Sequence, residues 1–163
     1  EVLTRTTSAT TGLDVLAAPG TVTAGTYAVN ITTAASVASQ TGSGFGASYS
    51  GQFIGSDTIT ISTGTGSAAV NVSNGQSLNT IINNLNTAFA SNGVSVSATN
   101  VGGQLKLTST MGPGSSSSFT VSSSHSRIRN NFGINDGTYT GTNVAGTIGG
   151  LAATGVGDVL TGS

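Results

Sequence analysis

The chain has 163 residues, of which 6% are charged, and a formal net charge of −1 at pH 7. An ordinary soluble domain carries about 25% charged residues; here 24 serines, 27 threonines and 25 glycines dominate instead. Four basic residues are too few to follow a nucleic-acid backbone, no apolar run approaches the ~20 residues of a membrane helix, and the lack of cysteine excludes disulfides and thiolate metal sites. The composition therefore predicts a folded, nearly neutral, β-rich protein with neither a nucleic-acid nor a membrane partner.

The first fifty residues predict one good strand between two irregular segments. Residues 1–18 alternate only weakly, and "APGTVTAG" (18–25) is a turn-rich break. "TYAVNITT" (26–33) alternates apolar and polar residues, which predicts a half-buried strand. "SQTGSGFGASYSG" (39–51) predicts a flexible connector that contains a domain boundary.

A hairpin and a helix follow. "DTITISTGTGSAAVNVS" (57–73) alternates on both sides of a Gly-rich turn. Ser77 is a natural N-cap and Asn92-Gly93 a left-handed stop, so the longest helix is expected from about Ser77 to Ala90. Its apolar stripe consists of Leu78, Ile81, Ile82, Leu85, Ala88 and Phe89.

Three further strands are predicted by the alternation in 94–98, 105–107 and 118–124. Together with the hairpin and the helix they form a β-β-α-β-β-β unit, in which the helix is expected to cover one face of a sheet. From His125 onward the pattern is that of a loop and a sheet edge, and 143–162 predicts short strands separated by glycines.

The strand at 26–33 has no partner nearby in the sequence, and an unpaired strand with an apolar side is unstable. We expect it to pair with the late segment 143–162. The predicted fold is mainly β with one amphipathic helix (α+β). A unit at 42–137 would be inserted in a second small β domain built from 1–41 plus 138–163.

The sequence shows no catalytic site. The acidic residues are scattered, and His125, the one histidine, lies in a polar loop without a visible orienting acid. The chain is therefore expected not to be an enzyme and to hold no metal or cofactor. Arg127 and Arg129 are interpreted either as a charged strand edge or as a contact with a neighbouring subunit. Tyr49 and Tyr139 lie in predicted loops and are candidates for surface or glycan contacts.

Three segments carry a family resemblance. "AGTYAVNITTAASVASQTG" (24–42) and "NVAGTIGGLAATGVGDVLTG" (143–162) resemble stretches of the flagellar filament cap proteins, hook-associated protein 2. The hairpin, the helix and the "GQLKLTST" strand between them look like the flagellin hook IN motif. The resemblance departs from the family at residue 143, which is Asn where the family has Asp, and it lacks the family's long terminal coiled-coil helices, as expected for an outer region cut from a longer protein.

The resemblance implies a structural role in the bacterial flagellum. Cap proteins form a small ring at the distal filament tip, outside the cell, and help exported flagellin subunits fold into place. The expected partners are copies of the full-length protein and flagellin, with host surface glycans or mucin as a further contact in adhesion. Two alternatives stay open: a variable surface domain of a flagellin, and a carbohydrate-binding adhesin module.

Overall fold

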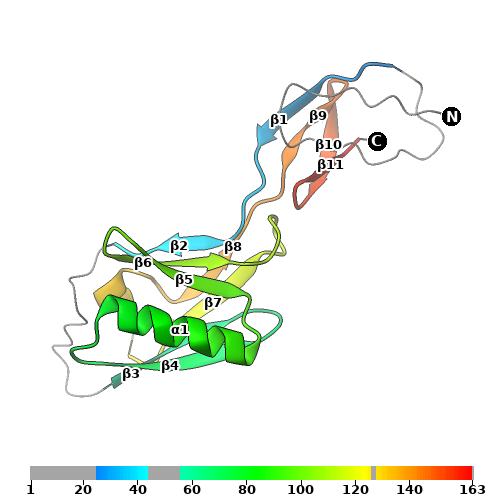
Figure 1. Ribbon diagram of the computed structural model, residues 1–163. Helices are drawn as coiled ribbons and strands as arrows, with labels where there is room; N and C mark the ends of the chain where they lie inside the picture. Colours follow the sequence, from blue (N-terminus) through cyan, green and yellow to red (C-terminus); the bar gives the residue numbers. More distant parts are fainter. Residues whose placement is uncertain (1–24, 44–55, 126–127, 163) are drawn as a thin grey trace.

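The computed structural model describes residues 25–43, 56–125 and 128–162, which form a larger unit and a small sheet that stands away from it (Figure 1). Two segments run side by side between them, one leading from β1 to β2 and the other from β8 to β9. The architecture is mainly β with one α-helix in the described residues, which confirms the predicted fold class.

The larger unit contains two antiparallel sheets. The first has the order β4-β3-β7-β8 and the second the order β2-β6-β5. The strands of the first are β3 (Ser56–Ser62), β4 (Ser67–Ser73), β7 (Ser118–Ser123) and β8 (Gly137–Thr140). Those of the second are β2 (Ser39–Thr41), β5 (Val96–Val101) and β6 (Gln104–Ser109).

The predicted hairpin is the pair β3 and β4, held in register from Ser56↔Ser73 to Ser62↔Ser67. Its alternation works as the sequence indicates. Ile61 and Val72 are fully buried, whereas the threonines and serines between them are at least partly exposed. A period of two therefore places one face of the hairpin in the core.

Helix α1 (Leu78–Asn92) confirms the predicted helix. The Ser77 hydroxyl accepts from the Thr80 N–H at its start, and Gly93 ends it with φ 65° and an N–H bond to the Phe89 carbonyl. The helix packs against β4 and β5, one strand from each sheet. The buried residues of the helix are those of the predicted stripe: Leu78, Ile81, Ile82, Leu85 and Phe89.

Two expectations for the larger unit are wrong. The helix does not cover a single sheet, because the predicted strands divide between two sheets and the core lies among all three layers. Residues 128–132 are not a loop at a sheet edge but a short π-helical turn, η1 (Ile128–Phe132). Ile128 and Phe132 are buried by it, so this turn contributes to the core.

The small sheet has the order β1-β9-β10-β11. Its strands are β1 (Val29–Thr33), β9 (Ala145–Ile148), β10 (Leu151–Val156) and β11 (Val159–Thr161). β1 pairs with β9, which confirms the predicted partnership of residues far apart in the sequence. β1 is exposed along its whole length, however, so the prediction of a half-buried strand is wrong for the described residues.

The ladders also locate the change from one unit to the other. β2 pairs with β6, and β8 pairs with β7, so both strands lie in the larger unit. The flexible connector expected at 39–51 is wrong for residues 39–41, because they form β2. Residues 44–51 lie outside the described residues, and so do residues 1–18. The division into 1–41 plus 138–163 around 42–137 stays a prediction, and the pairing favours boundaries close to Ser36 and Thr142.

Candidate functional site

A polar cluster joins the turn after β7 to the start of β3. The Asp57 side chain is completely buried and its Oδ1 accepts from the Ser124 hydroxyl at 2.6 Å and from the His125 N–H at 3.1 Å. The His125 Nδ1 lies 2.9 Å from the Ser124 Oγ and 3.6 Å from Asp57 Oδ1. The sequence showed no acid beside His125; the fold supplies one from a strand 68 residues earlier.

The geometry of this cluster is not that of a serine nucleophile. A nucleophilic hydroxyl donates its proton to the imidazole, with the acid on the opposite ring nitrogen. Here Ser124 donates to the carboxylate, and its oxygen accepts from the Thr58 N–H at 3.1 Å. The buried carboxylate therefore stabilises the turn by accepting hydrogen bonds from it, as buried polar groups require.

The residues predicted to make surface contacts are distributed differently. Arg127 and Tyr49 lie outside the described residues, and Arg129 lies within η1, so it is not on a strand edge. Tyr139 is on β8, half-buried, with its ring 5.4 Å from that of Phe119 and its hydroxyl donating to the Asn135 carbonyl at 2.8 Å. Burial raises the pKa of the Tyr139 hydroxyl, and the nearby Asp136 carboxylate raises it further.

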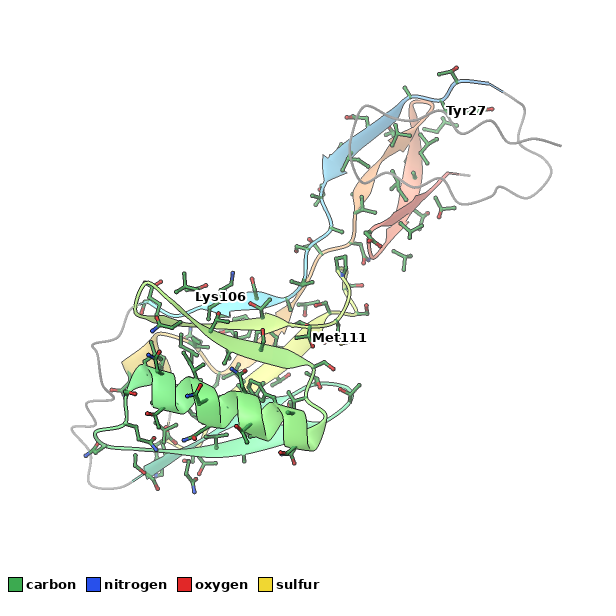
Figure 2. All side chains as sticks on the ribbon, in the orientation of Figure 1. Tyr27, Lys106 and Met111 are labelled. Atoms are coloured by element: carbon green, nitrogen blue, oxygen red, sulfur yellow. The ribbon has the colours of Figure 1, made fainter. Side chains whose placement is uncertain are left out.

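The small sheet carries side chains on both of its sides (Figure 2), and one of these sides is mainly apolar. Residues directly opposite each other in an antiparallel ladder point to the same side. The ladders therefore place Val29, Ile148 and Leu151 on one side of the sheet, together with Ile31 and Ala153. Leu160 of β11, opposite Gly155, continues this side. We call these six residues the apolar face. The other side is mixed and carries Asn30, Thr147, Ala152, Thr154, Val156, Val159 and Thr161.

The two units meet at a junction centred on Asn143. Its Oδ1 accepts from the Ser115 N–H of the larger unit at 2.9 Å and from the Gly157 N–H of the small sheet at 3.0 Å. Ser36 and Thr142 pair beside it, with N–H···O distances of 2.9 and 3.1 Å. One side chain thus links backbone from both units, and it contributes to the attachment of the small sheet to the larger unit.

The junction also gives the departure from the family pattern a physical explanation. Both strong contacts of Asn143 use its oxygen as an acceptor, and an Asp carboxylate accepts in the same way. The Asn143 Nδ2 adds a donor to the Ser115 Oγ at 3.2 Å, a hydroxyl that can itself donate to a carboxylate. An Asp at this position would accept the same two backbone hydrogen bonds.

Two kinds of site do not occur in the described part of the chain. No three His, Asp or Glu side chains come together there in a group that could hold a metal ion. Over the same residues, no helix is long and apolar enough to cross a membrane.

Comparison with known proteins identifies solved structures with a similar fold. No family model and no curated protein matches the chain. The D2-D3 domains of the flagellar cap protein FliD from Escherichia coli match with a TM-score of 0.56 and 19% identity, over 86% of this chain and 78% of that one. The same domains from Serratia marcescens match with a TM-score of 0.53 and 17% identity, over 88% of this chain and 86% of theirs.

This chain therefore has the fold of the outer domains of a flagellar cap protein, as the sequence resemblance implied. A match of this extent cannot be confined to the larger unit, so it includes strands of the small sheet. Against the three-domain structure of the Escherichia coli protein the TM-score is 0.55, and the match covers 43% of that chain.

Proposed function

We propose that the chain is the outer part of a flagellar filament cap, at the distal tip of the filament outside the cell. The observation that carries this proposal is the shared fold, which extends over both units of the chain. The described residues are compatible with a structural role, because their most elaborate polar cluster stabilises a turn and lacks the geometry of a nucleophile.

In this role the chain acts through its surfaces, with copies of the full-length protein and flagellin subunits as partners. A chain with only 6% charged residues offers little electrostatic selectivity, so contacts with arriving subunits would depend on shape and hydroxyl groups. Arg127 and Arg129 are the proposed subunit contact. We also propose that the larger unit is a flagellin hook IN motif.

Immunogold electron microscopy tests the proposal against the flagellin alternative. Antibodies raised against the 163-residue chain are applied to flagellated cells of the bacterium that encodes it. A cap predicts gold at filament tips alone, and deletion of the gene predicts flagellin released unpolymerised into the medium. Gold along the whole filament would instead identify a flagellin surface domain, and gold on filament-free cell surfaces would contradict both.

Contact with host glycans or mucin is a separate proposal, carried by Tyr49 and Tyr139. Tyr139 offers only part of its ring, because its inner face packs on Phe119 and its hydroxyl is already bonded. A glycan array with the Tyr49→Ala and Tyr139→Ala variants tests it. Binding that survives both substitutions would remove these residues from the proposal, and absence of binding by the unmodified chain would remove the adhesin alternative.

A further inference from the structure

The second sheet of the larger unit ends at β5, and α1 lies beside this strand. Among the described residues, β5 pairs with β6 and with no other strand. A strand at the end of a sheet directs a row of backbone N–H and C=O groups outward, and a strand of another chain can pair with them. α1 packs against β5 and against β4, the end strand of the first sheet (Figure 1). The helix therefore borders a strand whose outer edge needs protection.

The register of the β5–β6 hairpin identifies the residues of this outer edge. Ser95 and Thr110 continue the ladder beyond Val96, and the Thr110 N–H donates to the Ser95 carbonyl at 3.0 Å. Bonded and non-bonded pairs alternate along an antiparallel ladder. Val96, Ala98 and Asn100 therefore direct their backbone N–H and C=O groups away from β6.

The middle residue of this edge, Ala98, bonds through both of its backbone groups to one side chain of α1. The Ala98 N–H donates to Asn86 Oδ1 at 2.8 Å, and Asn86 Nδ2 donates to the Ala98 carbonyl at 2.9 Å. A residue of a neighbouring antiparallel strand exchanges the same two bonds, and an amide reproduces them because it carries both a carbonyl and an NH2 group. The Asn86 amide thus takes the hydrogen-bonding place of a fourth strand.

A second amide of α1 extends this contact along the edge. Asn100 Nδ2 donates to Asn79 Oδ1 at 3.1 Å. Asn79 precedes Asn86 by seven residues, about two helical turns, so both lie on one face of α1. The helix and its amides leave Ala98 only 3% exposed.

We propose that Asn86 closes the outer edge of β5 against pairing with a strand of another chain. β5 itself lacks the features that usually prevent such pairing, because Val96–Val101 contains neither a charged residue nor a proline. Val101 at its end is 47% exposed. Without the amide, the outward backbone groups of Ala98 become available to β5 of a second copy. This inference concerns the chain itself and does not depend on the proposed function.

Hydrogen exchange of the 163-residue chain, followed by NMR at low protein concentration, tests the bonds at Ala98. Asn86→Ala removes both bonds, and it does not weaken α1 by propensity because Ala favours helices more than Asn. We expect the Ala98 amide to exchange about tenfold faster than in the unmodified chain. Asn83→Ala, an exposed position on the same face of α1, is the matched control and should leave this rate unchanged.

Pyrene excimer fluorescence tests the closure against a second copy, because the sequence contains no cysteine that would compete for the label. A pyrene on Thr99→Cys, at an exposed position of β5, should give excimer emission that rises with concentration in Asn86→Ala. The unmodified sequence and Asn83→Ala should give none. The same label on Thr154→Cys, in the small sheet, monitors association through other surfaces and should not respond.

A charge at the edge separates strand pairing from a loss of stability. Val101→Lys added to Asn86→Ala should abolish the excimer emission, because a charged edge disfavours pairing, while the Ala98 amide continues to exchange fast. Asn86→Ser, whose side chain is too short to make both bonds, should give the same two changes as Asn86→Ala and serves if that variant does not fold.

Four results would overturn the proposal. They are an Ala98 exchange rate unchanged by loss of the amide, absence of excimer emission at Thr99→Cys in the same variant, emission that survives Val101→Lys, and equal emission at Thr99→Cys and Thr154→Cys. None of them depends on where the protein lies on the filament, so the proposed function is judged separately.

Discussion

The larger unit and the small sheet use a similar set of residues and reach different degrees of burial. In the larger unit the side chains of Ile61, Leu85 and Leu107 are completely buried. In the small sheet Leu151 and Val156 remain 65% and 69% exposed. The difference lies in the number of layers: two sheets and α1 surround one core, whereas β1, β9, β10 and β11 form a single layer among the described residues.

This contrast shows that strand pairing and stability are separate matters. Each β1 residue from Val29 to Ile31 has a partner in β9, as regularly as in the buried sheets. Hydrogen bonds exchanged with water contribute about 0.5–1.5 kcal/mol each, so a ladder alone offsets little of the entropy lost by ordering its strands. The small sheet therefore depends more on its attachment at Asn143 than the larger unit does on any single contact, and five predictions test this difference.

The largest effect is expected in the core of the larger unit. Leu85→Ala removes a fully buried side chain between α1 and the sheets, and should lower the free energy of unfolding by about 2–5 kcal/mol. Chemical denaturation followed by circular dichroism measures it. Asn84→Ala, at the exposed neighbouring position, is the control and should be neutral or slightly stabilising. A cost below 1 kcal/mol for Leu85→Ala would contradict a single closed core.

A pair of Val→Ala substitutions compares the two units directly. Val72 in β4 is completely buried, and losing its two methyl groups should cost about 1.5–3 kcal/mol. Val156 in β10 lies on the side of the small sheet opposite the apolar face and is 69% exposed, and the same change should stay within about 0.5 kcal/mol. Equal costs would show that Val156 is covered and that the contrast between the units is wrong.

The buried carboxylate is expected to contribute nearly as much as a core methyl group. Asp57→Ala leaves the Ser124 hydroxyl and the His125 N–H without their acceptor, at a cost of about 1–3 kcal/mol. Ser124→Ala removes one of these bonds and keeps the other, so a smaller loss is expected. Chemical denaturation of both variants measures the two losses in free energy of unfolding. If Asp57→Ala leaves that free energy unchanged, a stabilising role for the cluster is contradicted.

At the junction the expected change is in orientation more than in stability. Asn143→Ala removes the acceptor shared by Ser115 and Gly157, at a cost of about 1 kcal/mol in the free energy of unfolding. With spin labels on cysteines placed in α1 and in β10, this variant should show a broader distribution of label-to-label distances. Asn143→Asp keeps an accepting oxygen and should leave the distance distribution narrow. Broadening of equal extent in both variants would show that the side chain does not set the orientation.

The smallest effect concerns alkaline pH. Because burial raises the pKa of Tyr139, the folded state favours its neutral form, and that contribution is complete below the usual tyrosine pKa and is lost as the pH rises through the raised value. Tyr139→Phe should lose the bond to Asn135, about 0.5–1.5 kcal/mol at neutral pH, and then lose less stability than the unmodified chain above about pH 10. The free energy of unfolding of both proteins is measured as a function of pH. If it falls equally for Tyr139→Phe and for the unmodified chain above about pH 10, the raised pKa of Tyr139 is contradicted.

Local periodicity allowed much of the larger unit to be predicted. The i, i+3, i+4 stripe with Ser77 and Gly93 predicted α1, because capping and amphipathicity are properties of neighbouring residues. The hairpin of β3 and β4 was predicted for the same reason, since both strands and their turn are contiguous. The resemblance to cap proteins rested on two other segments, 24–42 and 143–162, and the fold agrees with it.

The sequence by itself thus determined the helix, the hairpins and the pairing of the first strand with a late one, and only the tertiary structure decided how the layers divide. The split into two sheets and the burial of η1 depend on packing between distant segments, which no local period records. Asp57 meets Ser124 across 67 residues, and Ser36 meets Thr142 across 106. Alternation in 26–33 predicted which side chains share a face, but whether a face is buried depends on the layer opposite, and that layer is set by the fold as a whole.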